Sequence, residues 1–219
     1  MRQARRAGHI SFERSFEINP ETRLQNYDHR KERLLKAAAR VFAANGFAST
    51  SMRDLARAAG MSLAGLYYYC EGKDDLLYQI QKACFESVSK GAAEVVRRAS
   101  GPEEKLAAFI SHHVHFFVSH MGEMKVLAHE AESLSGEMLK EITRLKRGYV
   151  DMLVDLLAAL DGASAEGRAR RQIAAYTLFG MMNWIYTWYH PGGAASVHEL
   201  SDTITRLFLN GYQVEVSAS

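Results

Sequence analysis

The sequence predicts an all-α protein, on three observations. Only three prolines occur among the 219 residues. No long stretch alternates apolar and polar residues with the period of two that strands show, whereas apolar residues recur at spacings of three and four between helix-start and helix-stop signals. A hydrophobic content of 47% and a charged content of 24% are ordinary for a globular protein with a substantial core. We therefore expect a bundle of about nine helices.

The first helix is predicted over residues 28–45. Leu34, Ala38 and Phe42 recur at helical spacing and would form its inner face. Gly46 follows directly and would end the helix, because glycine adopts the backbone conformation of a helix C-terminus at little cost. This helix is expected to pack against the next two.

Residues 51–69 are predicted to form two short helices joined by a tight turn. Ser51 and Asp54 have the spacing of a capping box, which begins a helix at about residue 52. Gly60 would stop that helix, and Ser62 can cap the second one. Such a pair is a helix-turn-helix, and its second helix has the size of an element that enters the major groove of DNA.

An ordinary helical corner is the alternative for this segment. It is disfavoured because suitable residues coincide at all four helix-contact positions, which are Ala56, Gly60, Met61 and Leu66. With Leu66 inward, the second helix, residues 63–69, ends in three consecutive tyrosines on its outer side. Exposed aromatic side chains indicate a binding partner.

The run from Arg33 to Leu77 resembles the DNA-binding domain of the TetR family of bacterial transcriptional regulators. The resemblance is carried by LLKAAARVFAANGF, by the Thr-Ser start of the second helix, by Ala-Gly-Met-Ser in the turn, by Leu-Tyr-Tyr-Tyr after it, and by Lys-Asp-Asp-Leu further on. Cys70 stands where the family usually has Phe, and Leu63 where a polar or basic residue is common. The first departure indicates a looser core, and the second indicates apolar contacts to DNA, such as with thymine methyl groups.

The resemblance implies a DNA-binding surface with two kinds of contact. The residues expected to hold phosphates are Ser51, Arg53, Ser62, Tyr67, Tyr69 and Lys73. The residues expected to face bases are Leu63, Ala64, Gly65 and Tyr68.

The remaining six helices are predicted from the same start and stop signals. Gly72 and Lys73 begin a long helix with two acids in its first turn, and Gly101 and Pro102 begin the next. These helices are expected over residues 73–98, 102–119, 121–129, 135–160, 165–189 and 197–212.

Three parts of the chain follow from this order. Residues 1–27 would be a flexible basic arm, 28–75 the DNA-binding domain, and 76–219 an effector-binding and dimerisation domain. The arm's five arginines, which would reach phosphates or an A·T-rich minor groove, are Arg2, Arg5, Arg6, Arg14 and Arg23. Residues 1–75 carry 13 Lys and Arg against 9 Asp and Glu, and residues 76–219 carry 14 against 16, which fits a DNA-facing first part.

The last two helices carry more apolar surface than one chain can cover. Pairing with a second copy in a four-helix bundle would bury it, and TetR-type proteins dimerise there. The alternative is an intramolecular core. The expected interface residues are Ile173, Gly180, Trp184, Trp188, Leu200, Ile204, Leu207, Phe208 and Gly211.

Aromatic, Met and His residues crowd the body helices and suit an apolar pocket with a few polar groups, although many of them would be plain core. The expected effector-pocket residues are Phe109, His113, Phe116, Phe117, Met121, Met124, Tyr149, Met152, Tyr176, Phe179, Met182, Asn183 and Tyr186.

The effector class is indicated by resemblance alone. SLAGLYYY, NWIYTWYHPGG and VHELSDTITRLFLNG resemble TetR-type regulators of fatty-acid, sterol or aromatic acyl-CoA breakdown. An acyl or ring portion would then occupy the pocket, and Arg144, Lys146 or Arg147 would meet the coenzyme A phosphates. Basic residues on a helix are more often a solvated face.

Other classes of function fit less well. A metal site is suggested by five histidines, but no carboxylate or Cys lies at ligand spacing from them; they are His112, His113, His115, His120 and His129. No catalytic motif and no phosphate-binding loop occurs either. We therefore expect no metal, no cofactor and no enzymatic activity.

Composition points to the cell interior. Two cysteines are too few for a disulfide framework, and redox sensing by Cys70 is a minor alternative. No secretory signal or membrane-spanning stretch is evident, which suggests a cytoplasmic, nucleoid-associated protein without a membrane partner.

The sequence therefore predicts a repressor that binds a palindromic operator as a homodimer and is released by a small apolar-tailed effector. The alternative is an architectural DNA-binding protein of the same fold with no effector.

Overall fold

The computed structural model describes residues 20–130, 133–162 and 167–217, and in these residues the protein is all-α, as predicted. The nine α-helices are α1 (Pro20–Asn45), α2 (Met52–Ala58), α3 (Leu63–Tyr67), α4 (Lys73–Arg98), α5 (Pro102–Ser119), α6 (Met121–His129), α7 (Gly136–Asp161), α8 (Arg168–Asn183) and α9 (Val197–Ser217), and a 3₁₀ helix, η1 (Trp184–Thr187), follows α8.

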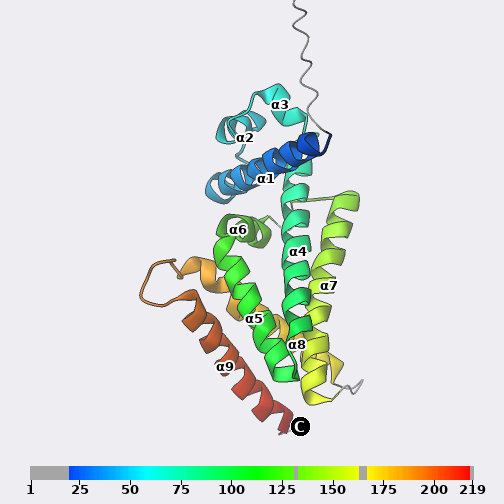
Figure 1. Cartoon of the computed structure of the whole chain (residues 1–219), viewed down its shortest axis with the longest axis vertical. Helices are drawn as coiled ribbons and strands as arrows, with labels where there is room; N and C mark the ends of the chain where they lie inside the picture. Colours follow the sequence, from blue (N-terminus) through cyan, green and yellow to red (C-terminus); the bar gives the residue numbers. More distant parts are fainter. Residues whose placement is uncertain (1–19, 131–132, 163–166, 218–219) are drawn as a thin grey trace, which may run out of the picture.

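The molecule is elongated, with α1, α2 and α3 forming a head at one end (Figure 1). Helix α4 begins in the head and runs down the body, where it packs against α5 and α7. Helix α8 packs on α7, and α9 packs along α5. The short helix α6 lies beneath α1 and contacts both α1 and α4, so it stands between the head and the rest of the body.

Two hydrophobic cores match this division. The head core is built around Leu34, Phe42, Leu55 and Leu66, and the body core around residues of α4, α5, α7, α8 and α9. The head core also takes in Val126 of α6 together with Leu134 and Ile142. Head and body therefore share buried apolar surface, so a shift of α6 or α7 would displace side chains in the head core.

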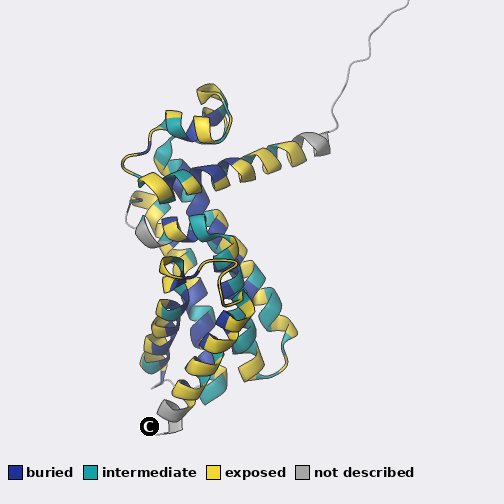
Figure 2. Cartoon of the chain, turned by 90° about the vertical axis from the view of Figure 1, so that its left-hand side faces the viewer, coloured by how far each residue is buried: buried dark blue, intermediate teal, exposed yellow. Residues whose placement is uncertain are grey.

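Helix α1 begins at Pro20 rather than at residue 28. Residues 24–30 of α1 are largely exposed and extend away from the body in Figure 2. Apolar periodicity underestimates the length of such a helix, because Glu, Arg and Gln favour helix formation in water even without an apolar face. Pro is also favourable at the first position of a helix. Of the expected arm, residues 1–19, which include Arg2, Arg5, Arg6 and Arg14, lie outside the described residues.

The predicted helix over 165–189 is shorter than expected. Residues 163–166 lie outside the described part, and the α-helical pattern of α8 ends at Asn183, where η1 tightens the last turn before Pro191. Tightening into a 3₁₀ turn is common where an α-helix ends.

Helices α4 and α5 approach closely at Gly91. The ring of His112 lies where a side chain at Gly91 would begin, and its Nε2 is within 3.2 Å of the Val88 carbonyl oxygen. Only a residue without a Cβ leaves room for this imidazole, so the helix spacing depends on Gly91.

The far end of the body is tied together by a buried carboxylate. Asp161 accepts hydrogen bonds from Arg171 Nε at 2.8 Å and from the Tyr212 hydroxyl at 2.8 Å. Burial opposes the charge of Asp161, but the hydrogen bonds from Tyr212, Arg171 and Arg170 outweigh it and hold its pKa below the usual value. This cluster joins the end of α7 to α8 and α9.

Among the described helices, none has the length and apolar content needed to cross a bilayer.

Candidate DNA-binding surface, dimer face and effector cavity

The two short helices of the head begin at the predicted caps. The Ser51 hydroxyl accepts from the Asp54 backbone N–H at 3.2 Å, and the Asp54 carboxylate accepts from the Ser51 backbone N–H at 3.2 Å, which completes the capping box. Ser62 caps α3 by accepting from the Gly65 backbone N–H at 3.0 Å. These local bonds satisfy backbone donors that a helix start otherwise leaves open.

The turn between them is set by Gly60. Its φ of +66° lies in the left-handed region, and the next residue, Met61, donates its N–H to the Ala56 carbonyl at 2.9 Å. Leu55 and Leu66 are both fully buried and bring the two helices together in the head core. The chain therefore forms the helix-turn-helix that the sequence predicts.

Helix α3 turns a largely apolar surface outward. Leu63, Ala64, Tyr67 and Tyr68 are exposed, with Tyr67 at 51% and Tyr68 at 70%. Gly65 is half-buried, and a Cβ at that position would lie 3.1 Å from the Ser62 hydroxyl oxygen. Of the predicted base-facing residues, Gly65 is thus the one turned toward its own helix cap.

Tyr27 supports the end of this surface. Its ring stacks on Tyr69 with centroids 5.0 Å apart and meets the edge of Tyr68 at 5.8 Å. Sequence reasoning placed Tyr27 in a flexible arm, and nothing local signals that it reaches residues some forty positions later. The early turns of α1 therefore hold Tyr68 and Tyr69 in position.

Lys73, at the first residue of α4, has intramolecular partners. Its ammonium donates to the carbonyl oxygens of Phe47 at 2.8 Å and Ala48 at 3.3 Å, and it lies 4.5 Å from the centroid of the Phe47 ring. An ammonium has three N–H groups, so one remains after these two bonds. The structure thus gives Lys73 a positioning role beside the phosphate contact that the sequence predicts.

An apolar stripe on α8, on η1 and on Trp188, the residue that follows η1, faces solvent. Ile173, Tyr176, Trp184 and Trp188 are all more than half exposed, and Gly180 lies among them. On α9, Leu207 and Gly211 are exposed as well. These seven residues are the candidates for a surface that pairs with a second copy, and this surface is called the dimer face.

Three of the expected interface residues belong to the core instead. Leu200, Ile204 and Phe208 are buried within the chain, where α9 packs against α5. Helix α9 has apolar residues on two sides, and periodicity cannot tell which side a neighbouring helix of the same chain will cover.

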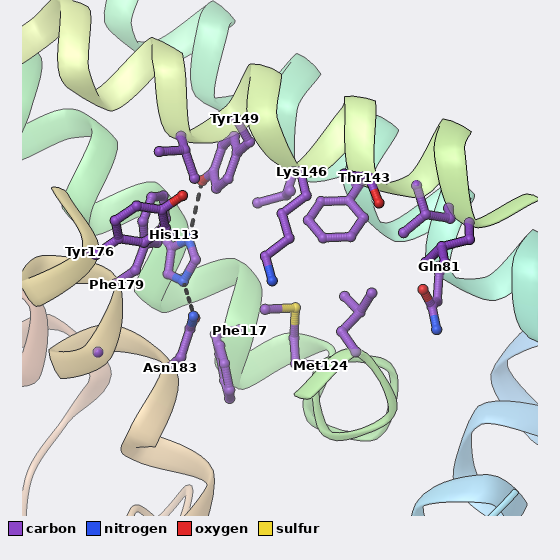
Figure 3. A pocket seen from close by; sticks show the side chains of 17 residues that line it. Gln81, His113, Phe117, Met124, Thr143, Lys146, Tyr149, Tyr176, Phe179 and Asn183 are labelled. Carbon is purple, nitrogen blue, oxygen red and sulfur yellow. Dashed lines mark hydrogen bonds between the residues drawn. The ribbon is translucent and has the colours of Figure 1, made fainter. Parts of the chain in front are cut away.

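The body contains a cavity of about 520 Å³, lined by residues of α4, α5, α6, α7 and α8 (Figure 3). It is open to solvent on one side, because the lining residues Thr143, Lys146 and Tyr176 are exposed. Its volume is in the range of small-molecule sites. Of the expected pocket residues, seven line it: His113, Phe117, Met124, Tyr149, Tyr176, Phe179 and Asn183.

The other six expected pocket residues lie outside the lining of this cavity. They are Phe109, Phe116, Met121, Met152, Met182 and Tyr186. Phe109 and Met182 are fully buried, so they fill the core between helices. A crowd of aromatic and Met residues marks the neighbourhood of a cavity but does not distinguish its wall from the packing behind it.

The cavity wall also includes residues that the sequence did not single out for it. Helix α4 contributes Gln81, Phe85 and Val88, whose spacing of four and three is a single helical stripe. This helical stripe could have predicted the contribution of α4 to the wall. It is hard to recognise in the sequence because the same helix also carries the apolar residues that link head and body. The other wall residues of this kind are Leu127, Leu139, Ile142, Thr143, Val150 and Gly180.

One end of the cavity is polar. His113 accepts a hydrogen bond at Nδ1 from the Tyr149 hydroxyl at 3.1 Å, and its Nε2–H donates to the Asn183 side-chain oxygen at 3.1 Å (Figure 3). Because an amide oxygen can only accept, the imidazole proton belongs on Nε2. Complete burial lowers the pKa of His113 to about 4, so the ring is neutral near pH 7.

Lys146 reaches from α7 into the same cavity, toward Met124 (Figure 3). Among the described residues that line the cavity it is the only lysine or arginine. Arg144, Lys146 and Arg147 are all exposed on α7, but Arg144 and Arg147 lie outside the lining, and Arg144 lies 3.9 Å from Glu141. Of the three basic residues expected near an anionic group, the structure therefore brings Lys146 to the cavity.

Glu130 connects the end of α6 to the head. Its carboxylate accepts from the Phe47 backbone N–H at 3.0 Å, and its carbonyl oxygen accepts from the Gln81 side chain at 3.1 Å. A cavity-wall residue and a head-loop residue thus share one partner.

Both cysteines, Cys70 and Cys84, are buried. Burial raises the pKa of the Cys70 thiol, and raises that of Cys84 to about 12, so both are poor nucleophiles. Within the described part of the chain no group of three or more His, Cys, Asp or Glu side chains could hold a metal ion.

Two family descriptions match the chain. Residues 34–80 match "Bacterial regulatory proteins, tetR family", and residues 99–212 match "Tetracyclin repressor-like, C-terminal domain". The first covers the helix-turn-helix and the second covers most of the body that contains the cavity.

Full-length relatives are regulators. The chain is 24% identical over 181 residues to the fatty acid metabolism regulator protein of Bacillus subtilis, covering 81% of this chain and 93% of that protein. It is 24% identical over 187 residues to the transcriptional repressor KstR2 of Mycolicibacterium smegmatis, covering 83% and 90%. Among solved structures, AibR in complex with isovaleryl coenzyme A and operator DNA is 28% identical with a TM-score of 0.71, over 81% of this chain and 97% of AibR.

Proposed function

This chain belongs to the TetR family of bacterial regulatory proteins, and from that premise we propose that it is a homodimeric repressor that binds a palindromic operator and is released by an acyl-CoA. The family consists of DNA-binding transcriptional regulators, and the relatives described above are regulators rather than enzymes. Residues 28–75 would bind DNA, and residues 76–219 would bind the effector and the second copy. A protein with this role would act in the cytoplasm, at the nucleoid.

The outward surface of α3 is the proposed base-reading element. Leu63, Ala64 and Tyr68 would meet base edges in the major groove, where a leucine or alanine side chain can contact the thymine methyl group. With no Lys or Arg among them, preference for A·T pairs is expected over preference for guanine.

The proposed phosphate contacts flank this element. Ser51, Arg53, Ser62 and Tyr67 are exposed at the starts of α2 and α3 or along their outer sides. Lys73 would use its remaining N–H at the N-terminus of α4, which favours anions. These contacts would set the register of the head on DNA and the salt dependence of binding.

The dimer face supports the proposed pairing. Four large apolar side chains more than half exposed along one helix, its 3₁₀ extension and the residue that follows are rare on a monomer surface, and Trp184 alone is 62% exposed. Helices from two copies would bury them in a four-helix bundle. Two heads related by a twofold axis would then address successive major grooves, about 34 Å apart.

The observation that carries ligand control is the position of the cavity. Its wall includes α4 and α6, and these two helices contact α1 of the head. Tyr176 and Gly180 belong both to the cavity wall and to the dimer face. An occupant would therefore press on the helices that set the separation of the two heads.

Release would follow from a population shift. The ligand needs to prefer the head separation that does not fit DNA, and a difference of about 1 to 3 kcal/mol between the two arrangements changes operator affinity roughly 5- to 150-fold.

The acyl-CoA assignment draws on the chemistry of the lining. Most of the wall is apolar and suits an acyl chain, and Lys146 can pair with an anion. The complex of AibR, a structural relative, contains isovaleryl coenzyme A.

The test is fluorescence anisotropy of the protein on DNA from upstream of its own gene, with acyl-CoA thioesters of increasing chain length and the matching free acids. We expect tight, salt-sensitive binding that a thioester reverses and its acid does not. Lys146→Met should raise the thioester concentration needed for release, whereas Arg147→Met, which removes the same charge outside the cavity, should leave it unchanged.

Release by no thioester would refute the acyl-CoA assignment. Tight binding that no compound reverses would move the protein to the architectural class. Equal effects of the Lys146 and Arg147 variants would show that only overall charge matters.

A further inference from the structure

Gln81 of α4 is a buried polar side chain with one unused end. The side chain is 1% exposed and lines the cavity. Its Nε2 donates to the Glu130 carbonyl oxygen at 3.1 Å, while its Oε1 is buried and has no hydrogen-bond partner in the described part of the chain. A buried acceptor without a donor destabilises the folded protein, so its presence in a cavity wall calls for an explanation.

The orientation of this amide is fixed by its partner. The Glu130 carbonyl can only accept a hydrogen bond, so the nitrogen of Gln81 must face Glu130 and the oxygen must be the free end. Rotating the amide would place two acceptors against each other. Figure 3 shows Gln81 at the opposite end of the cavity from His113.

The other buried polar groups of the wall are already paired. His113, Tyr149 and Asn183 bond to one another at the far end. Along α4 the next wall residues after Gln81 are Phe85 and Val88, which have no donor to offer. The Gln81 oxygen is thus an acceptor that the wall itself leaves unmatched.

We propose that Gln81 Oε1 accepts a hydrogen bond from a hydroxyl or amide N–H group carried on the apolar part of the effector. The effector class is therefore an apolar molecule that bears a donor inside its chain or ring system, such as a hydroxylated acyl group. The inference deepens the proposed function, on which it rests, by naming a specificity-determining residue and the chemical group that it selects.

The position of Gln81 also gives this contact access to the head. The same amide holds Glu130, whose carboxylate accepts from the Phe47 backbone N–H at 3.0 Å. An effector group that donates to the Gln81 oxygen would therefore contact a side chain that is connected to the head loop through a single residue, Glu130.

The test uses matched probes that need no coenzyme A. Binding of 1-alkanols with six to ten carbons is compared with binding of alkyl methyl ethers of equal length, which can accept a hydrogen bond but cannot donate one. Affinities are measured by calorimetry on the full-length wild-type protein and on Gln81→Met, which preserves the length and approximate volume of the side chain. Thermal melting confirms that each variant is folded.

Gln79→Met is the matched control. Gln79 lies on the same helix and also has a buried Oε1 without a partner, but it does not line the cavity. Wild-type protein and Gln79→Met should both bind the best alkanol about tenfold more tightly than its ether, the effect of one well-placed hydrogen bond. Gln81→Met should reduce that preference to less than about threefold.

The proposal is overturned if the wild-type protein binds alkanols no more tightly than ethers, if neither probe binds, or if the preference survives in Gln81→Met. These outcomes are separate from failure of the proposed function, which is measured as the absence of thioester-dependent release of DNA. If the protein prefers alkanols to ethers but no thioester releases it from DNA, the role of Gln81 is retained and the acyl-CoA assignment is rejected.

Discussion

Acidification should destabilise the protein through His113. This imidazole is completely buried, and burial lowers its pKa from 6.5 to about 4. In the unfolded chain the ring takes up a proton near its ordinary pKa, but in the folded protein it remains neutral until the pH approaches 4. Between these values the unfolded state binds more protons, so stability is lost as the pH falls through this window.

The expected loss follows from the two pKa values. Linkage gives a decrease of about 2 kcal/mol in the free energy of unfolding between about pH 7.5 and about pH 5.0. The cost does not require breaking the hydrogen bonds at the ring. An imidazolium can still donate to Asn183 from Nε2, and the Tyr149 hydroxyl can rotate to accept at Nδ1. The cost arises from placing a charge in an apolar interior.

The assay is urea unfolding at both pH values and at one protein concentration, for wild type and for His113→Gln. The variant will be less stable at both pH values, so the quantity of interest is the difference between their pH dependences. His112 has a pKa that is also lowered by burial, but it is present in both proteins and cancels. His198→Gln is the control, because that ring is exposed and pairs with Asp202 at 3.4 Å.

Wild type should lose about 2 kcal/mol more than His113→Gln on acidification, and His198→Gln should behave as wild type. Equal losses for wild type and His113→Gln would refute a buried neutral histidine at this position.

Three further substitutions test packing, DNA contact and pairing. Gly91→Ala should destabilise the protein by about 1 to 3 kcal/mol in urea unfolding, because its Cβ would overlap the His112 ring. Gly148→Ala, which meets nothing within 4 Å in the middle of α7, should instead add up to about 1 kcal/mol, and equal effects would contradict the close approach at Gly91. Lys73→Met should weaken operator binding and reduce the slope of log affinity against log salt by about one. An unchanged slope would show that Lys73 contacts only the loop that contains Phe47 and Ala48, and no phosphate. Trp184→Asp should yield monomers in sedimentation velocity and lose tight operator binding, and a variant that remains dimeric would exclude this face.

The helix-turn-helix was predictable because its determinants are close together in the sequence. Ser51 and Asp54 are three residues apart, as are Ser62 and Gly65, and Gly60 needs only its own backbone freedom to form the turn. Such interactions act within one turn of helix, and their pattern is visible without knowing the fold.

The contacts that complete the head are not local. Lys73 bonds to a carbonyl 26 residues earlier, and Glu130 accepts from a backbone N–H 83 residues earlier. Tyr27 reaches Tyr69 only because α1 extends beyond its apolar stripe. No periodicity in the sequence encodes these pairs.

The sequence by itself determined the helical class, the helix-turn-helix with its caps, and the crowding of aromatic residues in the body, because each depends on neighbours along one helix. The tertiary structure decided which of those residues enclose the cavity, since His113 meets Asn183 70 residues away and Gln81 meets Glu130 49 residues away. It also decided that Leu200, Ile204 and Phe208 are core while Leu207 remains exposed. A helix with apolar residues on two sides carries no record of which side its own chain will cover, because that depends on the packing of all the other helices.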